Sequence, residues 1–230
     1  SRDSISWIGQ IGGISRFDKK QLKFTACPSS SINKTKNLRN NPIWDIYMDS
    51  KGYLWLAALN DIAYRSQTPW EAGCNFFPMD SIIPQIKKQS IHSAYFITEH
   101  QPGHFLIGTD NGLLSYNRNK KTYKQIHFSK NGEDTPGNLY VYTHARDHKG
   151  NYWLGTINGL YFYNPQNNTY KSFTNQPGKP ESISDNLVLS MFFDEEKQKL
   201  WIGTKKTGIN TLNLEAYYKN PQKQPVFKYI

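Results

Sequence analysis

Hydrophobic and polar residues alternate in short runs along the chain, and the same arrangement of runs returns about every 48 residues. The clearest runs are Ile43–Met48, Ile91–Thr98, Leu139–Ala145 and Leu187–Phe193. Side chains that alternate between two faces are typical of β-strands. No segment has a sustained helical period, so the pattern predicts an all-β protein with almost no helix.

A Trp-x-Gly motif, or a close variant of it, follows each alternating run and sets the period. Its third residue is in turn Gly9, Ala57, Gly108, Gly155 and Gly203. The spacings between these residues are 48, 51, 47 and 48. A constant period of about 20–50 residues is the signature of a repeat architecture. The chain therefore contains five copies of one supersecondary unit.

Each unit accounts for four antiparallel strands. A tight turn joins the alternating run to the motif, as in Asp49–Gly52, where the carboxylate can hold backbone N–H groups and the glycine closes the hairpin. A Gly-Leu-x-x-Tyr-Asn segment, such as Gly112–Asn117, supplies the third strand. The fourth strands are aromatic-rich edges: Leu22–Phe24, Tyr123–Phe128, Tyr170–Phe173 and Val226–Tyr229.

Such units predict β-propeller blades, which are four-stranded antiparallel sheets stacked around an axis. The motif tryptophan fills the space between one blade and the next, and the small residue two positions later lets neighbouring sheets approach. We place the units at approximately residues 1–27, 43–79, 91–128, 139–173 and 187–230 of one propeller segment, 1–230.

The phase of the repeat predicts an incomplete portion of a larger propeller. The first unit begins at its second strand, and the C-terminal Val226–Ile230 is a fourth strand. No spare first strand is left to close a ring of five blades.

The net charge of +10 would attract polyanions, although a basic surface equally serves solubility. The basic residues are scattered and form no run typical of a nucleic-acid-binding tail, so nucleic acid is not an expected partner. No apolar run approaches the roughly 18 residues that span a membrane, so any membrane contact is expected only through segments outside this chain.

Cys27 and Cys74 are the only cysteines. They follow the motif position by 18 and 17 residues in neighbouring units. Equivalent positions on adjacent blades are usually too far apart for a bridge. We expect free thiols, and leave an oxidising compartment open.

Two segments carry a family resemblance. Val141–Asn164 contains Asp-x-x-Gly-x-x-Trp-Leu-Gly-Thr, and Asn186–Asp194 runs into Leu200–Thr204 and Gly208–Asn213, with a Ser182–Leu187 lead-in. Both resemble the two-component regulator propeller repeat. The resemblance implies a periplasmic sensor region, anchored in the inner membrane by other segments and typically recognising glycans. It further implies fourteen blades in two propellers, a homodimer, and a histidine kinase with a phosphorelay outside this chain.

The remaining residues contain no recognisable catalytic, metal or cofactor motif. His144 and His148 are four residues apart, which on a strand separates them by roughly 13 Å. No dense group of metal ligands and no phosphate-cradling glycine loop occurs, so we expect no metal and no cofactor. The Asp-x-x-Gly-x-x-Trp spacing is one residue longer than a sialidase Asp box. We expect no enzymatic activity, although paired carboxylates at strand ends leave a polysaccharide-cleaving propeller as an alternative.

A ligand would meet the face that carries the second-to-third-strand loops and the connections between blades. The second unit departs from the pattern at Ala57 and Asp61, and the fifth carries one extra residue in its loop. Neutral drift in loops is the simpler explanation at any single position. The candidate ligand-binding residues are Asn60, Arg65, Trp70, Asn111, Asn158, Lys205 and Lys206.

These residues predict binding rather than catalysis. Lysine and asparagine suit sugar hydroxyls or sulfates, and Trp70 could stack on a sugar ring, although inter-blade packing is the commoner role of a propeller tryptophan. We expect an oligosaccharide ligand, with the charge favouring an acidic one. The alternative is a structural scaffold that docks neighbouring blades or a second propeller of the same protein.

Overall fold

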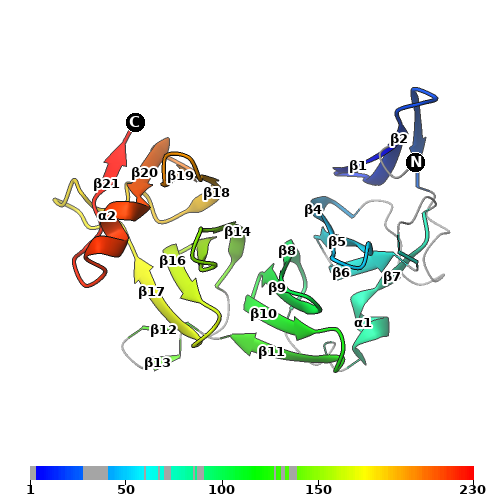
Figure 1. Ribbon diagram of the computed structural model, residues 1–230, viewed down its shortest axis with the longest axis horizontal. Helices are drawn as coiled ribbons and strands as arrows, with labels where there is room; N and C mark the ends of the chain where they lie inside the picture. The colour runs from blue at the N-terminus through cyan, green and yellow to red at the C-terminus, as the bar shows by residue number, and fades with distance from the viewer. Residues whose placement is uncertain are drawn as a thin grey trace. The chain divides into compact units, whose positions relative to one another are not determined.

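The computed structural model describes residues 4–27, 41–59, 61–66, 68–69, 74–84, 86, 91–126, 128–130, 133–134 and 139–230. They form two compact units, Ser1–His127 and Phe128–Ile230, which are described separately (Figure 1).

The first unit contains three antiparallel sheets and one helical turn. The first sheet consists of β1 (Ile5–Gln10), β2 (Gly13–Asp18) and β3 (Lys23–Ala26). The second consists of β4 (Ile43–Met48), β5 (Leu54–Ala58), β6 (Asp61–Ser66) and β7 (Phe76–Pro78), followed by α1 (Met79–Ile82). The third consists of β8 (Ala94–Gln101), β9 (His104–Thr109), β10 (Gly112–Asn117) and β11 (Thr122–Ile126).

The second unit contains two four-stranded sheets and a small hairpin. The hairpin is β12 (Ser129–Lys130) with β13 (Glu133–Asp134). The next sheet consists of β14 (Val141–Arg146), β15 (Tyr152–Thr156), β16 (Gly159–Asn164) and β17 (Thr169–Phe173). The last consists of β18 (Val188–Asp194), β19 (Lys199–Thr204), β20 (Ile209–Asn213) and β21 (Phe227–Tyr229), with α2 (Leu214–Lys219) before its last strand.

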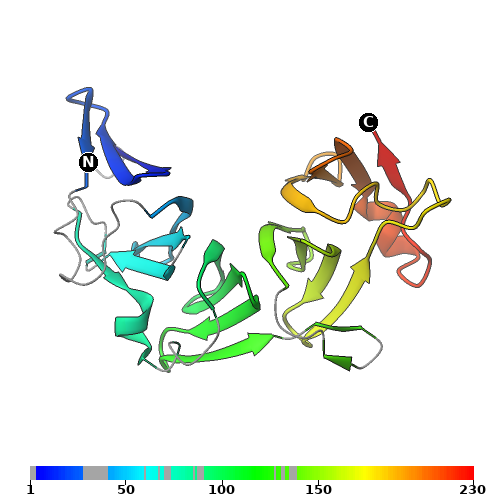
Figure 2. The same cartoon turned by 180° about the vertical axis from the view of Figure 1, so that it is seen from behind.

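The prediction of four-stranded antiparallel blades is confirmed. Each of the four larger sheets pairs its strands in sequence order, as a meander does. The first sheet has three strands within the described residues, which fits a repeat whose described part begins at its second strand. Within the units, β4 lies beside β8 and β14 beside β18 (Figures 1 and 2), so the first strands of successive blades are neighbours.

The small motif residue permits this close approach, as predicted. A Cβ built on Gly155 would lie 2.6 Å from Val188 Cγ1 of the next blade and 2.6 Å from Thr143 Cγ2. A Cβ on Gly9 would lie 3.0 Å from Ile43 Cγ2 in the same way. Contacts this short require the neighbouring strand to move, so glycine sets the spacing between blades.

Two of the motif tryptophans, Trp55 and Trp153, fill the space between blades. Trp55 has no exposed surface, and its ring centroid lies 4.8 Å from that of Phe105 on the following blade. Trp153 is equally buried and lies 5.2 Å from Tyr217 of α2, an element that the hydrophobic pattern did not predict. These contacts join successive sheets into the two cores.

The expectation of free thiols is wrong, because Cys27 and Cys74 form a disulfide with a Cα–Cα distance of 5.3 Å. Cys27 directly follows β3, whereas Cys74 precedes β7 by two residues. The two cysteines therefore do not occupy equivalent places on the outer strands. One comes from the end of its strand and the other from the approach to its strand, which brings their Cα atoms within bridging range.

Candidate functional site

Each blade has two ends, a turn end and a loop end, which differ in the connections that they carry. The turn end carries the connection between the first and second strands, such as Asp49–Gly52. The loop end carries the connection between the second and third strands, such as Asp110 and Asn111 between β9 and β10.

At the turn end, the aspartate of the repeat motif holds its turn together. Asp49 Oδ1 accepts hydrogen bonds from the backbone N–H groups of Lys51 and Tyr53, each at 2.9 Å. Asp49 Oδ2 accepts a hydrogen bond from Trp55 Nε1 at 2.9 Å. The carboxylate thus fixes both the turn and the buried tryptophan.

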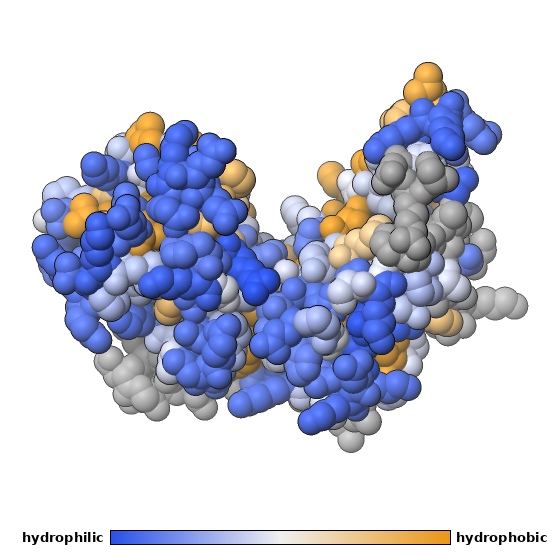
Figure 3. Space-filling model, in the orientation of Figure 1, coloured by the Kyte–Doolittle hydropathy of each residue, from blue (hydrophilic) through white to orange (hydrophobic). Residues whose placement is uncertain are grey.

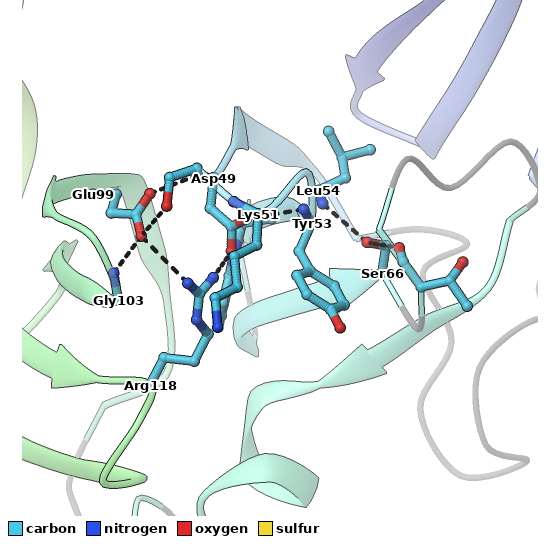
Figure 4. Close-up of polar contacts among 11 residues, drawn as sticks. Asp49, Lys51, Tyr53, Leu54, Ser66, Glu99, Gly103 and Arg118 are labelled. Carbon is cyan, nitrogen blue, oxygen red and sulfur yellow. Dashed lines mark hydrogen bonds and ion pairs between the residues drawn. The ribbon is translucent and has the colours of Figure 1, made fainter. Parts of the chain in front are cut away.

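The next blade supplies a charged partner for the same carboxylate. Arg118 reaches from the end of β10 and places its guanidinium between Asp49 and Glu99 (Figure 4), forming an ion pair with Asp49 and a second contact of 3.6 Å with Glu99. Glu99 also accepts hydrogen bonds from the backbone N–H of Ser50 at 2.6 Å and of Gly103 at 2.5 Å. The side chains of Asp49, Glu99 and Arg118 are 0%, 4% and 9% exposed, so this is a buried charge network in which two carboxylates share one guanidinium.

The second unit builds the same junction with an uncharged partner. Asp147 Oδ1 accepts from the backbone N–H groups of Lys149 and Asn151, and its Oδ2 accepts from Trp153 Nε1 at 3.1 Å. The Tyr218 hydroxyl of α2 donates to Asp147 Oδ2 and accepts a hydrogen bond from Asn151 Nδ2 at 2.8 Å. Burial, together with the hydrogen bond to Asp147, raises the pKa of Tyr218, so the hydroxyl keeps its proton. The motif carboxylates are therefore structural, which speaks against a catalytic role for them.

At the loop end, each connection between blades runs beside a second-to-third-strand turn. In the second unit the Gly159 N–H donates to Asn186 O at 2.6 Å, and the Lys205 N–H donates to Leu187 O at 3.0 Å. The adjacent residues 186–187 thus hold the turn of Asn158 next to the turn of Lys205 and Lys206. The structure brings these three predicted residues to one end of neighbouring blades, and all three side chains are exposed.

Asn111 has the corresponding position in the first unit. Its backbone N–H donates to Thr109 Oγ1 at 3.0 Å, as that of Asn158 donates to Thr156 Oγ1 at 3.0 Å. The neighbouring Asp110 accepts from the backbone N–H of His92 at 3.0 Å, which ties this turn to the preceding connection. The two asparagines therefore stand on equivalent turns of the repeat.

The other predicted residues do not join this group. Arg65 pairs with Trp55 at the start of β5, so it lies at the turn end rather than the loop end. Its guanidinium carbon lies 4.6 Å from the centroid of the Tyr53 ring. Asn60 and Trp70 fall outside the described residues.

Sequence reasoning missed a set of aromatic rings at the loop end. The register of the first strand shifts between Ile43 and Asp45, between Ala94 and Phe96, and between Val141 and Thr143. The bulged residues are Trp44, Tyr95 and Tyr142. A β-bulge re-aims a side chain out of the regular alternation, so the signal was an aromatic residue next to the first residue of each of these strands.

These rings form one pair in each unit. Trp44 is 57% exposed, and its ring centroid lies 6.3 Å from that of Tyr95. Tyr140 and Tyr142 stack with centroids 5.8 Å apart. The Ile157 N–H donates to Tyr140 O at 3.1 Å, which places the second pair beside the Asn158 turn. An aromatic platform next to an amide side chain is suited to a sugar ring, which offers both C–H and hydroxyl groups.

Three pockets lie away from these rings. One, of about 420 Å³, lies at the turn end of the first unit and includes Arg65 and Arg118 in its lining. Two in the second unit, of about 510 and 330 Å³, share Gln224 and Pro225 before β21. Neither of the pockets in the second unit contains a predicted site residue.

No group of three potential metal ligands occurs among the residues that the structure describes. Burial lowers the pKa of His144 to about 4, so this histidine is uncharged at neutral pH. None of the described helices has the length and apolar character needed to cross a membrane.

The chain resembles known proteins in part of its sequence and in its fold. Residues 37–60 match the family model of the two component regulator propeller. No curated protein matches the sequence. The matched segment includes β4 and β5, the strands that carry Trp44, Asp49 and Trp55.

Several solved propellers share the fold. The extracellular domain of a B. thetaiotaomicron protein described as a hybrid two component system superimposes with a TM-score of 0.72 at 20% identity, over 92% of this chain and 26% of that one. A second such domain from the same organism gives 0.70 at 22% identity, over 99% of this chain and 27% of that one. The β-propeller domain of Cps50 (Swd1) from Myceliophteria thermophila gives 0.60 at 11% identity, over 91% of this chain and 63% of that one. The chain spans about a quarter of the length of the two extracellular domains.

Proposed function

We propose that the chain is the ligand-sensing, extracytoplasmic propeller region of a hybrid two-component signal-transduction protein and that it recognises an oligosaccharide. Signalling would then pass to a histidine kinase and phosphorelay outside this chain, in an inner-membrane protein that forms a homodimer. The similarity to extracellular domains of hybrid systems and the match to the two component regulator propeller support the sensor class.

The loop-end aromatic pairs are the observation that carries the choice of ligand. Trp44 lies on the first strand of its blade and is exposed. Contact between its apolar ring and water is unfavourable unless a ligand covers the ring. Trp44 and Tyr95 in the first unit, and Tyr140 and Tyr142 in the second, supply ring faces at the same end of their blades as the turns of Asn111 and Asn158.

The disulfide supports the proposed location. Cys27 and Cys74 are joined, and such bonds persist mainly in oxidising compartments such as the periplasm. A cytoplasmic scaffold would be kept reduced.

Calorimetric titration with neutral and acidic oligosaccharides tests this function. The Trp44→Ala variant should bind the recognised oligosaccharide at least about tenfold more weakly, because a desolvated aromatic anchor commonly contributes more than 1.4 kcal/mol. Tyr229→Ala is the matched control, since Tyr229 is 64% exposed but belongs to an outer strand. If the folded chain binds no oligosaccharide, the proposed ligand class is wrong; if Trp44→Ala binds one as tightly as the wild type, the ligand does not contact the Trp44 ring.

A second role, docking of a neighbouring blade, is supported by the last sheet. Phe192 pairs with Trp201 in the register in which Ala145 pairs with Trp153. Trp153 is fully buried beneath the following blade, whereas Phe192 is 65% exposed and Trp201 is only partly buried. We propose that another blade of the same protein covers this face. A Phe192→Asp variant of the longer protein should then lose stability, while the same change in this chain alone should have little effect on its unfolding.

A further inference from the structure

The pocket at the turn end of the first unit differs from the loop-end site in its chemistry. It has a volume of about 420 Å³ and lies between β6, the α1 turn and the connection from β10 to β11. Three cationic side chains line it, Arg65, Arg118 and Lys121, together with the hydroxyl-bearing Ser81 and Tyr116. No acidic side chain lies in its described lining.

Two buried donors in this lining have no partner. The Nε atoms of Arg65 and of Arg118 are inaccessible to solvent, and neither makes a hydrogen bond within the described part of the chain. The Arg118 side chain as a whole is 9% exposed. A buried donor left unpaired costs about 1–3 kcal/mol, and more when the group is charged. Both atoms belong to side chains that line the pocket, so an acceptor bound there would offset part of this cost by pairing with the same guanidinium groups.

The charge balance around the pocket points to an anionic acceptor. The terminal nitrogens of Arg118 are already paired with Asp49 and Glu99. Arg65 has no carboxylate within ion-pair distance among the described residues, and the ring of Tyr53 holds its guanidinium in place. The Lys121 side chain is exposed at the pocket. Arg65 and Lys121 therefore contribute positive charge to the pocket without an ion-pair partner among the described residues, although Asp49 and Glu99 beside Arg118 together carry one charge more than it does.

The Tyr116 hydroxyl lies within electrostatic reach of both arginines. Burial raises the pKa of Tyr116, and the charges of Arg65 and Arg118 both oppose that rise. Both guanidinium groups are thus within electrostatic reach of the same hydroxyl, which stays protonated at neutral pH and can donate a hydrogen bond.

We infer that this pocket binds an oxyanion group, a carboxylate or a sulfate, carried by a glycan. The Arg65 guanidinium and Tyr116 Oη would donate to its oxygens, and the charges of Arg118 and Lys121 would add to the attraction. Charge-assisted hydrogen bonds of this kind recognise planar carboxylates and tetrahedral sulfates alike. The glycan origin of the anion rests on the proposed function, whereas the anion site itself rests only on the pocket.

Nitrogen-15 spectra of the arginine Nε–H groups test the site directly. The folded chain is titrated with sodium sulfate, with glucuronate and with glucose, at an ionic strength held constant with sodium chloride. Sulfate or glucuronate should shift the Arg65 and Arg118 signals in a saturable manner, and glucose should not. The comparison of the two anions distinguishes a sulfated from a uronic acid ligand.

Three variants then assign the effect to the pocket. Arg65→Gln should weaken binding of the anion at least about tenfold, the effect expected from losing one charge-assisted hydrogen bond. Lys121→Gln should weaken it about two- to fivefold, because an exposed charge contributes less, and this exposed change tests the site even if Arg65→Gln unfolds. Lys124→Gln is the control, since Lys124 is exposed on β11 of the same sheet and does not line the pocket.

The outcomes separate this inference from the proposed function. If neither anion shifts the two signals, or if Lys124→Gln weakens binding as much as Arg65→Gln, the anion site is wrong. The chain could then still bind neutral oligosaccharides at the loop end. If the anions bind as expected but no oligosaccharide does, the site stands and the proposed ligand class fails.

Discussion

The Tyr218 hydroxyl donates a hydrogen bond to the carboxylate of Asp147, 71 residues earlier in the chain and on the preceding blade. Asp49 accepts from Arg118 across 69 residues in the same way. The repeat therefore supplies the same acceptor in both places, an aspartate that accepts hydrogen bonds from its own turn and from the motif tryptophan. The following blade completes it with whichever donor it carries, a tyrosine in one unit and an arginine in the other.

Removing the Tyr218 hydroxyl should destabilise the second unit. Tyr218→Phe leaves the ring in place but deprives buried Asp147 of a donor, so the free energy of unfolding should fall by about 1–3 kcal/mol. Urea unfolding followed by tryptophan fluorescence measures the change. Tyr229→Phe, which alters an exposed hydroxyl on the outer strand, should leave the midpoint unchanged. Equal midpoints for wild type and Tyr218→Phe would mean that the hydrogen bond contributes no net stability.

The spacing between blades predicts a second loss. Gly155→Ala places a Cβ 2.6 Å from Val188 Cγ1 and from Thr143 Cγ2, so one of the two inner strands must shift. Overpacking of this kind costs about 1–3 kcal/mol. Gly12→Ala is the control, because nothing lies within 4 Å of the added carbon. Denaturant midpoints of the two variants should differ clearly, and equal midpoints would show that the blades yield to the extra methyl group.

The sequence was sufficient for the elements that repeat. The motif glycines and tryptophans recur in every or nearly every repeat. The alternating pattern predicts a strand over Ile43–Met48, and β4 has the same bounds. Elements that occur once carry no such signal. The α2 helix lies between β20 and β21 of the last blade and has no described counterpart at that place in the other blades, so neither it nor the pairing of Tyr218 with Asp147 could be inferred from periodicity.

The candidate site could be predicted only in part, for a geometric reason. Asn111 and Asn158 follow directly from the motif spacing, because the second-to-third-strand turn is part of the repeat. The irregular sequence around Arg65 indicates a ligand-binding residue at the loop end. Arg65 instead lies near the end of β6, four residues after Asp61, and therefore at the turn end of the blade. The side chain directions at the first-strand bulges depend on the register, which hydrophobic alternation does not reveal.

The disulfide should stabilise the first unit substantially. Cys27 and Cys74 are separated by 47 residues, and closing a loop of that size removes about 4 kcal/mol of chain entropy from the unfolded state. Reduction, or the Cys27→Ser/Cys74→Ser variant, should therefore lower the melting temperature by on the order of 10 °C. The same reductant added to the double variant should change nothing. An unaltered melting temperature after complete reduction would contradict this contribution.

Buried His144 predicts a loss of stability in acid. Its pKa is lowered to about 4 by burial, whereas an unfolded chain would protonate the ring near 6.5. Between these values the unfolded state binds a proton that the folded state does not, so this stability is complete above pH 6.5 and is lost as the pH falls toward 4. The full loss amounts to at most about 3 kcal/mol.

Unfolding free energies measured from pH 7 to pH 4 test this expectation by difference. His144→Gln removes the titrating ring, so the wild type should lose more stability than the variant as the pH falls. The difference also removes the effect of Asp45, whose pKa burial raises and whose contribution changes with pH in the opposite sense. His92→Gln is the control, because the His92 side chain is 77% exposed. If the pH profiles of wild type and His144→Gln are parallel, His144 is protonated in the folded chain as readily as in the unfolded one.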